Sequence, residues 1–266
     1  MLVVDHISKT FAKGTVNEHC AIKDLSITLK DGDFVTIVGS NGAGKSTLFN
    51  AICGSFLTDS GKILLDDMDI TFKSEHERAR VIGRVFQDPM KGTAPNMTIE
   101  ENLAMAYTRS GRHSSMFSRA ITKEKVKFFR ENLARYNMGI EDRMKTKIGL
   151  LSGGQRQVVT LLMCTLSVPK LLLLDEHTAA LDPATAKKVM EITRTIVEEN
   201  HITTMMITHN LQQALDTGNR TIMMDSGEIV YDVAGEEREK LSVQDLVRLF
   251  GEKRNRELTN DRMMLG

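Results

Sequence analysis

A glycine-rich stretch of the chain has the composition of a phosphate-binding loop. Residues 39–46 read GSNGAGKS, after the apolar run FVTIV and before a helical pattern over 47–53. Glycines let successive backbone N–H groups turn inward around phosphate oxygens, and the following helix adds the positive end of its dipole. We expect Lys45 to reach the β- and γ-phosphates and Ser46 to hold magnesium; an ordinary glycine-rich turn is the alternative. The predicted nucleotide-binding residues here are Gly39, Ser40, Asn41, Gly42, Ala43, Gly44, Lys45, Ser46 and Thr47.

A run of four leucines ends in two adjacent carboxylates. Residues 171–176 read LLLLDE, the pattern of a buried strand that ends in Asp175 and Glu176. Neighbouring side chains of a strand point to opposite faces, so the two carboxylates cannot do the same work. Asp175 suits a magnesium ligand, and Glu176 suits the group that orients and deprotonates an attacking water. A plain helix cap is the alternative, but the upstream phosphate loop favours the catalytic interpretation.

A third motif opens another helix. Residues 151–155 read LSGGQ and precede the helical run RQVVTLLMCTL. Ser152 is placed to cap this helix, and Gly153 and Gly154 leave its first backbone N–H groups open to an anion. Because the chain already has a phosphate loop, this helix end is a second anion site that needs its own explanation.

The motifs lie between short apolar runs, which we expect to form strands. Near-continuous apolar character is typical of a parallel sheet that is covered on both faces. The helical pattern between two of these runs begins with Asp182 as N-cap and Pro183 at the first helical position. The sequence therefore predicts an α/β fold with a mostly parallel core sheet flanked by helices. The expected strands are Phe34–Val38, Leu171–Leu174, Thr204–Ile207 and Ile222–Met224.

Two regions depart from this pattern. Shorter, more alternating runs between DGD and DSG turns predict antiparallel strands over Ile7–Phe11, Ile22–Leu29 and Lys62–Asp66. From Pro89 to about Leu151 only helical patterns occur, which predicts a helical insertion.

The end of the chain is dominated by charged residues. Beyond Asp232 the strand pattern ends, and Ser242 begins a short predicted helix. Leu246, Val247 and Phe250 can share one face of this helix, and we expect that face to pack back on the domain, with contact to a partner as the alternative.

Composition and charge exclude several classes of protein. The chain has 266 residues, with 35 basic and 35 acidic side chains, and so lacks the charge of a dedicated nucleic-acid binder. Its longest uncharged apolar stretch, Val158–Pro169, is shorter than the roughly 20 residues that cross a bilayer. Early charged residues argue against a secretory peptide, and three widely spaced cysteines suggest neither a disulfide framework nor a zinc site. We therefore expect a cytoplasmic protein.

The order of the motifs resembles one family. The GKS loop is followed by Gln87, then by LSGGQ one helix upstream of LLLLDE, then by ALD and His209. In this order and spacing the chain resembles the ATPase subunits of ATP-binding cassette (ABC) transporters from Leu2 to about Asp232. The resemblance implies a P-loop ATPase domain over 1–235, with an antiparallel β subdomain and a helical subdomain over about 89–160. Residues 236–266 would form a helical, charged tail.

The resemblance also implies roles for single residues. Phe11 occupies the place of the aromatic side chain that stacks on adenine, with a core phenylalanine as the alternative. Gln87 matches the glutamine that contacts magnesium and water. Asp182 matches the aspartate that communicates between two nucleotide sites, and it can cap its helix as well. His209 matches the histidine that contacts the γ-phosphate and positions Glu176.

The second anion site is explained by the same resemblance. In this family the LSGGQ motif serves the ATP that the other subunit holds, so the ATP-bound protein is expected to be a head-to-tail homodimer with ATP and Mg²⁺. The residues of this motif are Ser152, Gly153, Gly154 and Gln155. The expected catalytic residues are Lys45, Gln87, Glu176 and His209, and the expected metal ligands are Ser46, Gln87 and Asp175.

Two positions differ from the commonest family pattern. His177 stands where proline is usual, and Ala180 stands where serine or glycine is frequent. Neither position supplies a reacting group. A charged His177 would perturb the pKa of the adjacent Glu176, and a passive role is the alternative that we favour.

These features predict an ATP-hydrolysing subunit that moves separate transmembrane subunits, at the cytoplasmic face of the membrane. The runs QDPMKGTAPNMT and DEHTAALDP resemble a subgroup of import ATPases that work with separate permeases and solute-binding proteins, with amino-acid-type solutes. The alternatives are an exporter ATPase and a soluble cassette protein that acts as an assembly scaffold. A DNA-repair or chromosome-structuring ATPase would need heptad segments or DNA modules, and neither is present in the sequence.

Overall fold

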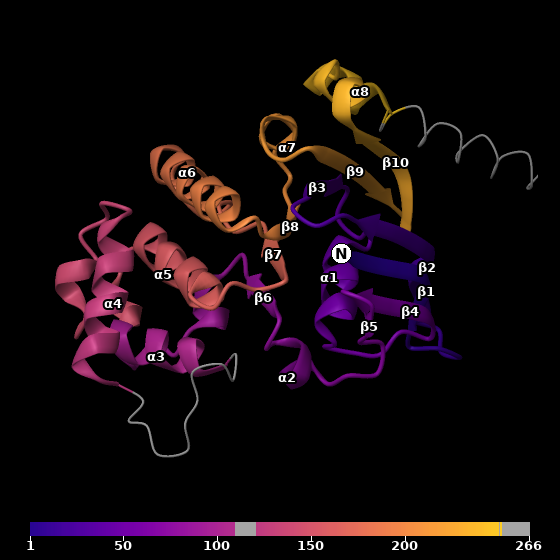
Figure 1. The fold of residues 1–266 in the computed structure, drawn as a ribbon. Coiled ribbons are helices and arrows are strands. Elements are labelled where there is room, and N and C mark those ends of the chain that lie inside the picture. Colours follow the sequence, from indigo (N-terminus) through magenta and orange to yellow (C-terminus); the bar gives the residue numbers. More distant parts are fainter. Residues whose placement is uncertain (110–120, 250, 252–266) are drawn as a thin grey trace, which may run out of the picture.

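A mostly parallel sheet forms the centre of the computed structural model, which describes residues 1–109, 121–249 and 251 (Figure 1). Its strands lie in the order β10-β9-β3-β8-β7-β6, and neighbouring strands are parallel except for the β9–β10 pair. The predicted α/β fold is confirmed. The strands are β3 (Phe34–Gly39), β6 (Ile82–Val85), β7 (Leu171–Asp175), β8 (Thr203–Ile207), β9 (Arg220–Asp225) and β10 (Glu228–Ala234).

Helices cover both faces of this sheet (Figure 1). One face packs against α1 (Lys45–Cys53), and the other packs against α5 (Gly153–Thr165) and α6 (Pro183–Asn200). The short helices α7 (Leu211–Asp216) and α8 (Gly235–Glu239) contact β3 and β10, respectively.

The leucine run of β7 accounts for this double coverage. Leu171 and Leu173 belong to the apolar cluster that includes α1, whereas Leu172 and Leu174 belong to the cluster that includes α5 and α6. Alternation along the strand thus buries all four side chains, each at 0% exposure.

A second, antiparallel sheet lies beside α1, with the order β2-β1-β4-β5. The predicted antiparallel pairing is confirmed, but β1 begins at Leu2 rather than Ile7 because Leu2 and Val4 are buried in the same core. The predicted strand over Lys62–Asp66 also ends one residue early, since Asp66 begins the turn to β5. The elements of this region are β1 (Leu2–Phe11), β2 (His19–Leu29), β4 (Ser60–Leu65), β5 (Met68–Asp69) and α2 (Glu75–Arg78).

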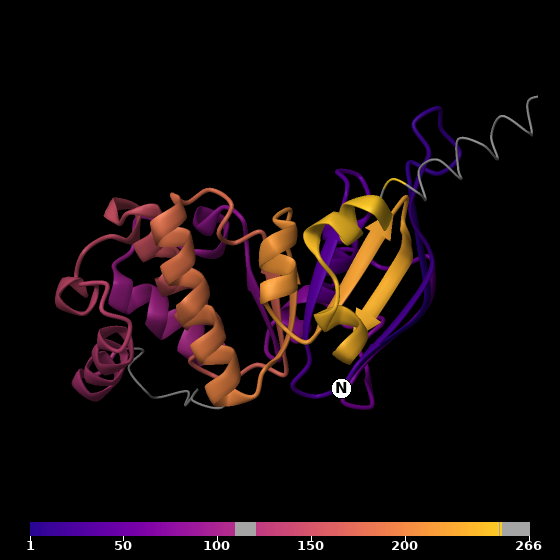
Figure 2. The ribbon, with the colours of Figure 1, turned by 90° about the horizontal axis from the view of Figure 1, so that it is seen from above.

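The predicted helical insertion is present in the described residues between β6 and β7. Its helices pack together at one end of the molecule, with the antiparallel sheet at the other end (Figure 2). They are η1 (Pro89–Gly92), α3 (Ile99–Arg109), α4 (Lys123–Ala134), η2 (Glu141–Arg143), η3 (Ile148–Leu150) and α5.

The tail helix is only partly as predicted. Ser242 caps a helix over 243–249 through a reciprocal pair of bonds with Asp245. Leu246 is fully buried among side chains of β3, β9 and α7, so this residue packs on the domain as expected. The expectation for Val247 is wrong, because this residue is 55% exposed and does not belong to the cluster around Leu246. Phe250 lies outside the described residues.

Candidate active site

The loop over 39–44 leaves backbone donors unused at the start of α1. Gly44 is the N-cap residue with a left-handed φ of 96°, and it provides no side chain to cap the helix. A Cβ atom at Gly44 would lie 2.7 Å from the carbonyl oxygen of Ala21, so only glycine fits there. The first N–H groups of α1 are therefore open to an anionic ligand.

Lys45 is buried beneath this loop. Its ammonium group donates to the carbonyl oxygens of Gly39 at 2.7 Å and of Ser40 at 2.8 Å, and the residue is 6% exposed. Burial lowers the pKa of Lys45, while the carboxylates of Glu176 and Asp175 oppose that shift. The ammonium group of Lys45 is therefore held next to the loop that would bind phosphate.

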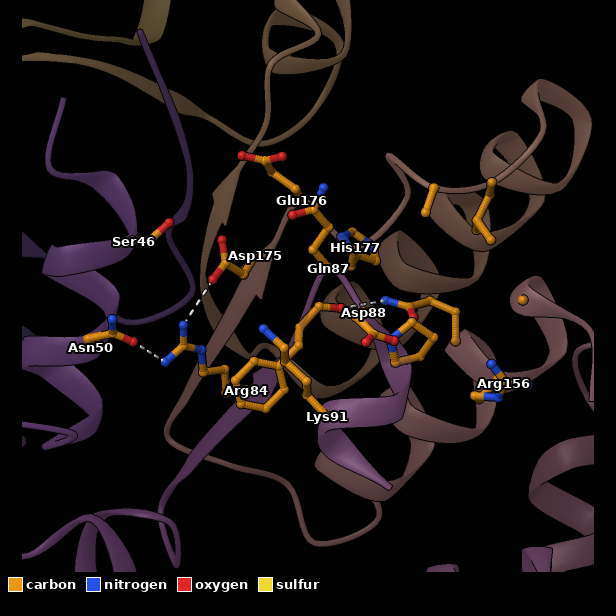
Figure 3. A pocket seen from close by; sticks show the side chains of 16 residues that line it. Ser46, Asn50, Arg84, Gln87, Asp88, Lys91, Arg156, Asp175, Glu176 and His177 are labelled. Atoms are coloured by element: carbon orange, nitrogen blue, oxygen red, sulfur yellow. Dashed lines mark hydrogen bonds and ion pairs between the residues drawn. The ribbon is translucent and has the colours of Figure 1, made fainter. Parts of the chain in front are cut away.

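The proposed metal ligands line one cleft. Ser46 from α1, Gln87 after β6, and Asp175 and Glu176 from the end of β7 surround a cleft of about 730 Å³ (Figure 3). Gly153 at the start of α5 lines the same cleft. Four distant segments of the sequence thus meet near the carboxyl ends of the parallel strands, which is where open α/β sheets bind ligands.

A cation that the sequence analysis missed lies at the base of this cleft. Arg84 on β6 donates to Asp175 Oδ2 at 2.9 Å and to Asn50 Oδ1 at 2.6 Å (Figure 3). Its guanidinium also lies over the ring of Phe86, 4.6 Å from the centroid. One indication of this residue is present in the sequence, since Arg84 is a charged side chain inside the short apolar run of residues 81–86.

Glu176 and His209 are in direct contact. His209 Nε2 lies 2.7 Å from Glu176 Oε1, and the carboxylate side chain is 13% exposed. Glu176 has a left-handed φ of 47°, an unusual conformation for a non-glycine residue, and its N–H donates to the Ile207 carbonyl oxygen at 3.1 Å. The ends of β7 and β8 thus bring together a carboxylate and an imidazole that the sequence placed on separate strands.

His177 lies beside Glu176 at the wall of the cleft but is buried in the protein. It is 2% exposed, and its Nε2 lies 3.2 Å from the Thr193 hydroxyl. Burial lowers the pKa of His177 to about 4, so the ring is neutral near pH 7. The structure therefore favours the passive role over a charged neighbour for Glu176.

The LSGGQ segment begins α5 as predicted. Ser152 Oγ accepts from the Gln155 N–H at 3.3 Å, and Gln155 Oε1 accepts from the Ser152 N–H, which completes a capping box. The Gln155 side chain also donates to Met138, so it is engaged within the chain. A Cβ atom at Gly154 would lie 2.1 Å from Thr185, which gives this glycine a packing role.

Asp182 caps α6, as the sequence predicted. Its carboxylate accepts from the Thr185 N–H at 3.1 Å, and hydrogen bonds from Thr185 lower the pKa of Asp182.

Phe11 lies at the end of β1 and is 39% exposed, so it is not a core residue. Its ring meets Phe56 edge to face at a centroid distance of 5.2 Å. The Lys9 ammonium lies 5.6 Å from the Phe11 centroid and 5.3 Å from the Phe56 centroid. This exposed aromatic surface is available for stacking.

The fold and this cleft define a P-loop ATPase, in which Ser46 at the start of α1 and the carboxylate of Glu176 line one cleft. Residues 22–179 match the ABC transporter family, and the chain belongs to that family. It is an ATP-binding and ATP-hydrolysing subunit that powers solute transport across a membrane, which confirms the expectation from the sequence.

Relatives of known function are similar along nearly the whole chain. The tyrosine transport ATP-binding protein of Clostridioides difficile strain R20291 is 43% identical over 250 residues, which cover 94% of this chain and 98% of the relative. The phosphonates import ATP-binding protein PhnC of Lactococcus lactis subsp. cremoris strain SK11 is 30% identical over 254 residues, covering 94% of this chain and all of the relative. These names agree with the predicted resemblance to import ATPases.

A solved structure supports the same assignment. The dimeric, post-hydrolysis ATP-binding cassette MJ0796, bound to ADP and Pi, superposes with a TM-score of 0.76 at 28% identity. The match covers 88% of this chain and 98% of that chain.

Among the described residues, no helix has both the length and the apolar character that a bilayer span requires. As a transporter ATPase, the chain acts together with subunits that do cross the membrane.

Proposed function

We propose that this chain powers the import of an aromatic amino acid, as one half of a head-to-tail dimer that closes on two Mg-ATP molecules. The contact of His209 with Glu176, which lines the cleft together with Ser46, Gln87 and Asp175, is the observation that carries the hydrolytic part. The relative named for tyrosine transport supports the choice of solute, because its identity of 43% exceeds the 30–33% of the phosphonate, methionine and bicarbonate relatives.

Each proposed catalytic group has a distinct task. Glu176 accepts the proton of the attacking water, and His209 orients Glu176 and donates to the γ-phosphate. Lys45 exchanges its present carbonyl partners for the β- and γ-phosphate oxygens, and Gln87 orients the water from the side of the helical insertion. Phe11 stacks on the adenine.

The residues present fit a magnesium ion. Ser46 offers a hydroxyl, Gln87 an amide oxygen and Asp175 a carboxylate, which are the oxygen donors that magnesium prefers, and all three line one cleft. The ion would neutralise charge on the phosphates. Arg84 occupies one oxygen of Asp175 and leaves the other available.

The proposal of a shared site rests on the number of helix ends that can bind an anion, which is larger than one nucleotide per chain requires. The open start of α1 suffices for one nucleotide, yet Ser152 and Gly153 begin a second such helix. In a head-to-tail dimer the second end meets the γ-phosphate of the partner's nucleotide. ATP binding then drives closure, and hydrolysis permits reopening.

The proposed setting is the cytoplasmic face of the membrane. The ATPase domain over 1–235 contacts a separate permease there, and an extracytoplasmic solute-binding protein delivers the solute. The tail over 236–266 begins as part of the domain, because the Arg238 side chain is buried and donates to Thr217 and Thr221.

The test is reconstitution of the chain with its co-purifying membrane subunits in vesicles. We expect ATP-dependent accumulation of tyrosine or another aromatic amino acid, with ATPase activity stimulated by the loaded solute-binding protein. Glu176→Gln in the same complex is the matched control and should abolish uptake. Accumulation of methionine or a phosphonate instead would contradict the proposed solute class. Outward movement of the solute would indicate an exporter. Co-purification of the chain with soluble proteins alone would indicate an assembly scaffold.

A further inference from the structure

Gln213 lies between the two chain segments that carry Glu176 and His209. Its side-chain oxygen accepts from the Thr208 hydroxyl at 2.7 Å, and its side-chain nitrogen donates to the Thr178 hydroxyl at 3.3 Å. Thr208 directly precedes His209, and Thr178 follows shortly after Glu176. One amide group thus joins the two loops whose carboxylate and imidazole meet at 2.7 Å.

The orientation of this amide is set by its neighbours. The backbone N–H of Asn210 donates to Thr208 Oγ1 at 3.1 Å, which leaves the Thr208 proton for Gln213 Oε1. The side-chain nitrogen of Gln213 therefore faces Thr178. The backbone of Gln213 is tied as well, because its N–H donates at 2.9 Å to Asn210 Oδ1, the N-cap group of α7.

The other end of α7 is held by two arginines. Arg194 from α6 donates to the Asp216 carbonyl oxygen at 3.0 Å and to the Thr217 hydroxyl at 2.8 Å. The buried Arg238 from α8 donates to the carbonyl oxygens of Ala214, Leu215 and Thr217. Movement of α7 would break these bonds, so the helix is a rigid base for the Gln213 side chain.

The catalytic pair itself has little other support. His209 is 47% exposed, and within residues 1–109, 121–249 and 251 its ring contacts no hydrogen-bonding partner besides Glu176. The backbone ties the two segments where β7 and β8 end, through the bond from the Glu176 N–H to the Ile207 carbonyl oxygen, and beyond that point the separation of the two loops depends on side chains beside the pair. Gln213 is such a group, and it lines the cleft of about 690 Å³ on whose wall Glu176, His209 and both threonines also lie.

We propose that Gln213 is a positioning residue for hydrolysis, which fixes the distance between the Glu176 loop and the His209 loop. This inference rests on the catalytic roles proposed above for those two side chains. Gln213 is not among the residues of the cleft that holds Ser46 and Asp175, so its loss should change turnover and leave nucleotide affinity alone.

The experiment compares three variants of the full chain for kcat, for Mg-ATP affinity measured directly by fluorescence, and for Tm. Gln213→Leu keeps the volume of the side chain and removes both bonds, whereas Gln213→Glu can still accept from both hydroxyls. Gln212→Leu is the matched control on the same helix, because Gln212 is exposed and its amide donates to Asp216 one turn away.

We expect Gln213→Leu to lower kcat about tenfold with ATP affinity unchanged within about twofold, since two hydrogen bonds to the loops are lost. Gln213→Glu should restore most of kcat, and Gln212→Leu should match the original protein. Thr178→Val removes one of the two bonds and should lower kcat about threefold, which keeps the test valid if Gln213→Leu does not fold.

A double variant separates positioning from general destabilisation. In a His209→Ala background, Gln213→Leu should lower kcat by less than about twofold, because there is no imidazole left to position. An unchanged kcat for Gln213→Leu, or the same tenfold loss in both backgrounds, would overturn the inference. If His209→Ala itself keeps full turnover, the proposed role of the Glu176–His209 pair fails, which is a separate result.

Discussion

The carboxylate of Asp175 is paired with the guanidinium of Arg84 at 2.9 Å, and both side chains are mostly buried, at 14% and 13% exposure. The same guanidinium reaches Asn50, one helical turn after Ser46 on α1. Arg84 therefore links the helix and the strand that carry two proposed metal ligands.

The first prediction concerns the stability of this link. Arg84→Met should lower the free energy of unfolding by about 2 kcal/mol, because it leaves Asp175 without its cationic partner in a poorly solvated site. For a chain of this length the Tm should fall by about 4–8 °C, measured calorimetrically without nucleotide. Arg80→Met, at an exposed arginine nearby, is the control and should change Tm little. Equal Tm values for both variants would show that the pair contributes nothing.

The second prediction concerns Glu176. Glu176→Gln removes the proposed proton acceptor and keeps the shape of the side chain, so turnover should fall by about 10²–10⁴-fold while ATP affinity persists. An ATP-loaded dimer should then accumulate in size-exclusion chromatography. Lys45→Ala should give the opposite result, with weakened ATP binding. Turnover of Glu176→Gln within a few-fold of the original would remove this residue from catalysis.

The third prediction concerns adenine recognition. Stacking of a base on an aromatic ring is worth roughly 1–3 kcal/mol, so Phe11→Ala should raise the KM for ATP about tenfold and change kcat less. Phe56→Leu tests whether the edge-to-face neighbour orients the ring, and its effect should be smaller. A folded Phe11→Ala protein with the original KM would contradict stacking.

The fourth prediction is a pH dependence of stability. The pKa of His177 is about 4 in the folded chain against 6.5 for an exposed histidine, so the unfolded chain binds the proton more readily. Above pH 6.5 the histidine is neutral in both states, so the free energy of unfolding is at its full value. As the pH falls toward 4, only the unfolded chain takes up the proton, and the free energy of unfolding decreases. Relative to His177→Leu, the original protein should lose about 2–3 kcal/mol between pH 7 and pH 4.5. A constant difference, measured by urea unfolding at both pH values, would show that His177 does not titrate in this way.

Much of the core could be predicted because buried parallel strands are continuous apolar runs. The strands β3, β7, β8 and β9 have this signal, and the first three also end beside a chemically marked motif. β6 was missed because Gly83 and Arg84 interrupt a strand of only four residues, and β10 because it is a half-exposed edge strand with charged residues. In both cases pairing with a neighbouring strand, rather than local pattern, determines the conformation.

The candidate site shows the same limit. Short motifs located Lys45 at the start of a helix and Asp175 and Glu176 at the end of a strand, because in each case the adjacent residues of the sequence form the element that carries the side chain. Arg84 and Gln213 have no such motif, and their partners are distant in sequence, so only the folded chain reveals what they contact. The prediction for Val247 is wrong because the sequence shows which apolar residues lie near one helical face but not how much of that face the domain covers.

The shared nucleotide site is the central claim, and interchain cross-linking tests it most directly. Cys20, Cys53 and Cys164 are first replaced, and Ser40→Cys and Ser152→Cys are then introduced in separate batches that both carry Glu176→Gln. Disulfide formation requires Cα atoms within roughly 7 Å, so mixed batches should cross-link with Mg-ATP and give little product with ADP. Equal cross-linking with ADP, or none with ATP in a dimeric sample, would contradict the shared site and indicate a nucleotide site that is complete within one chain.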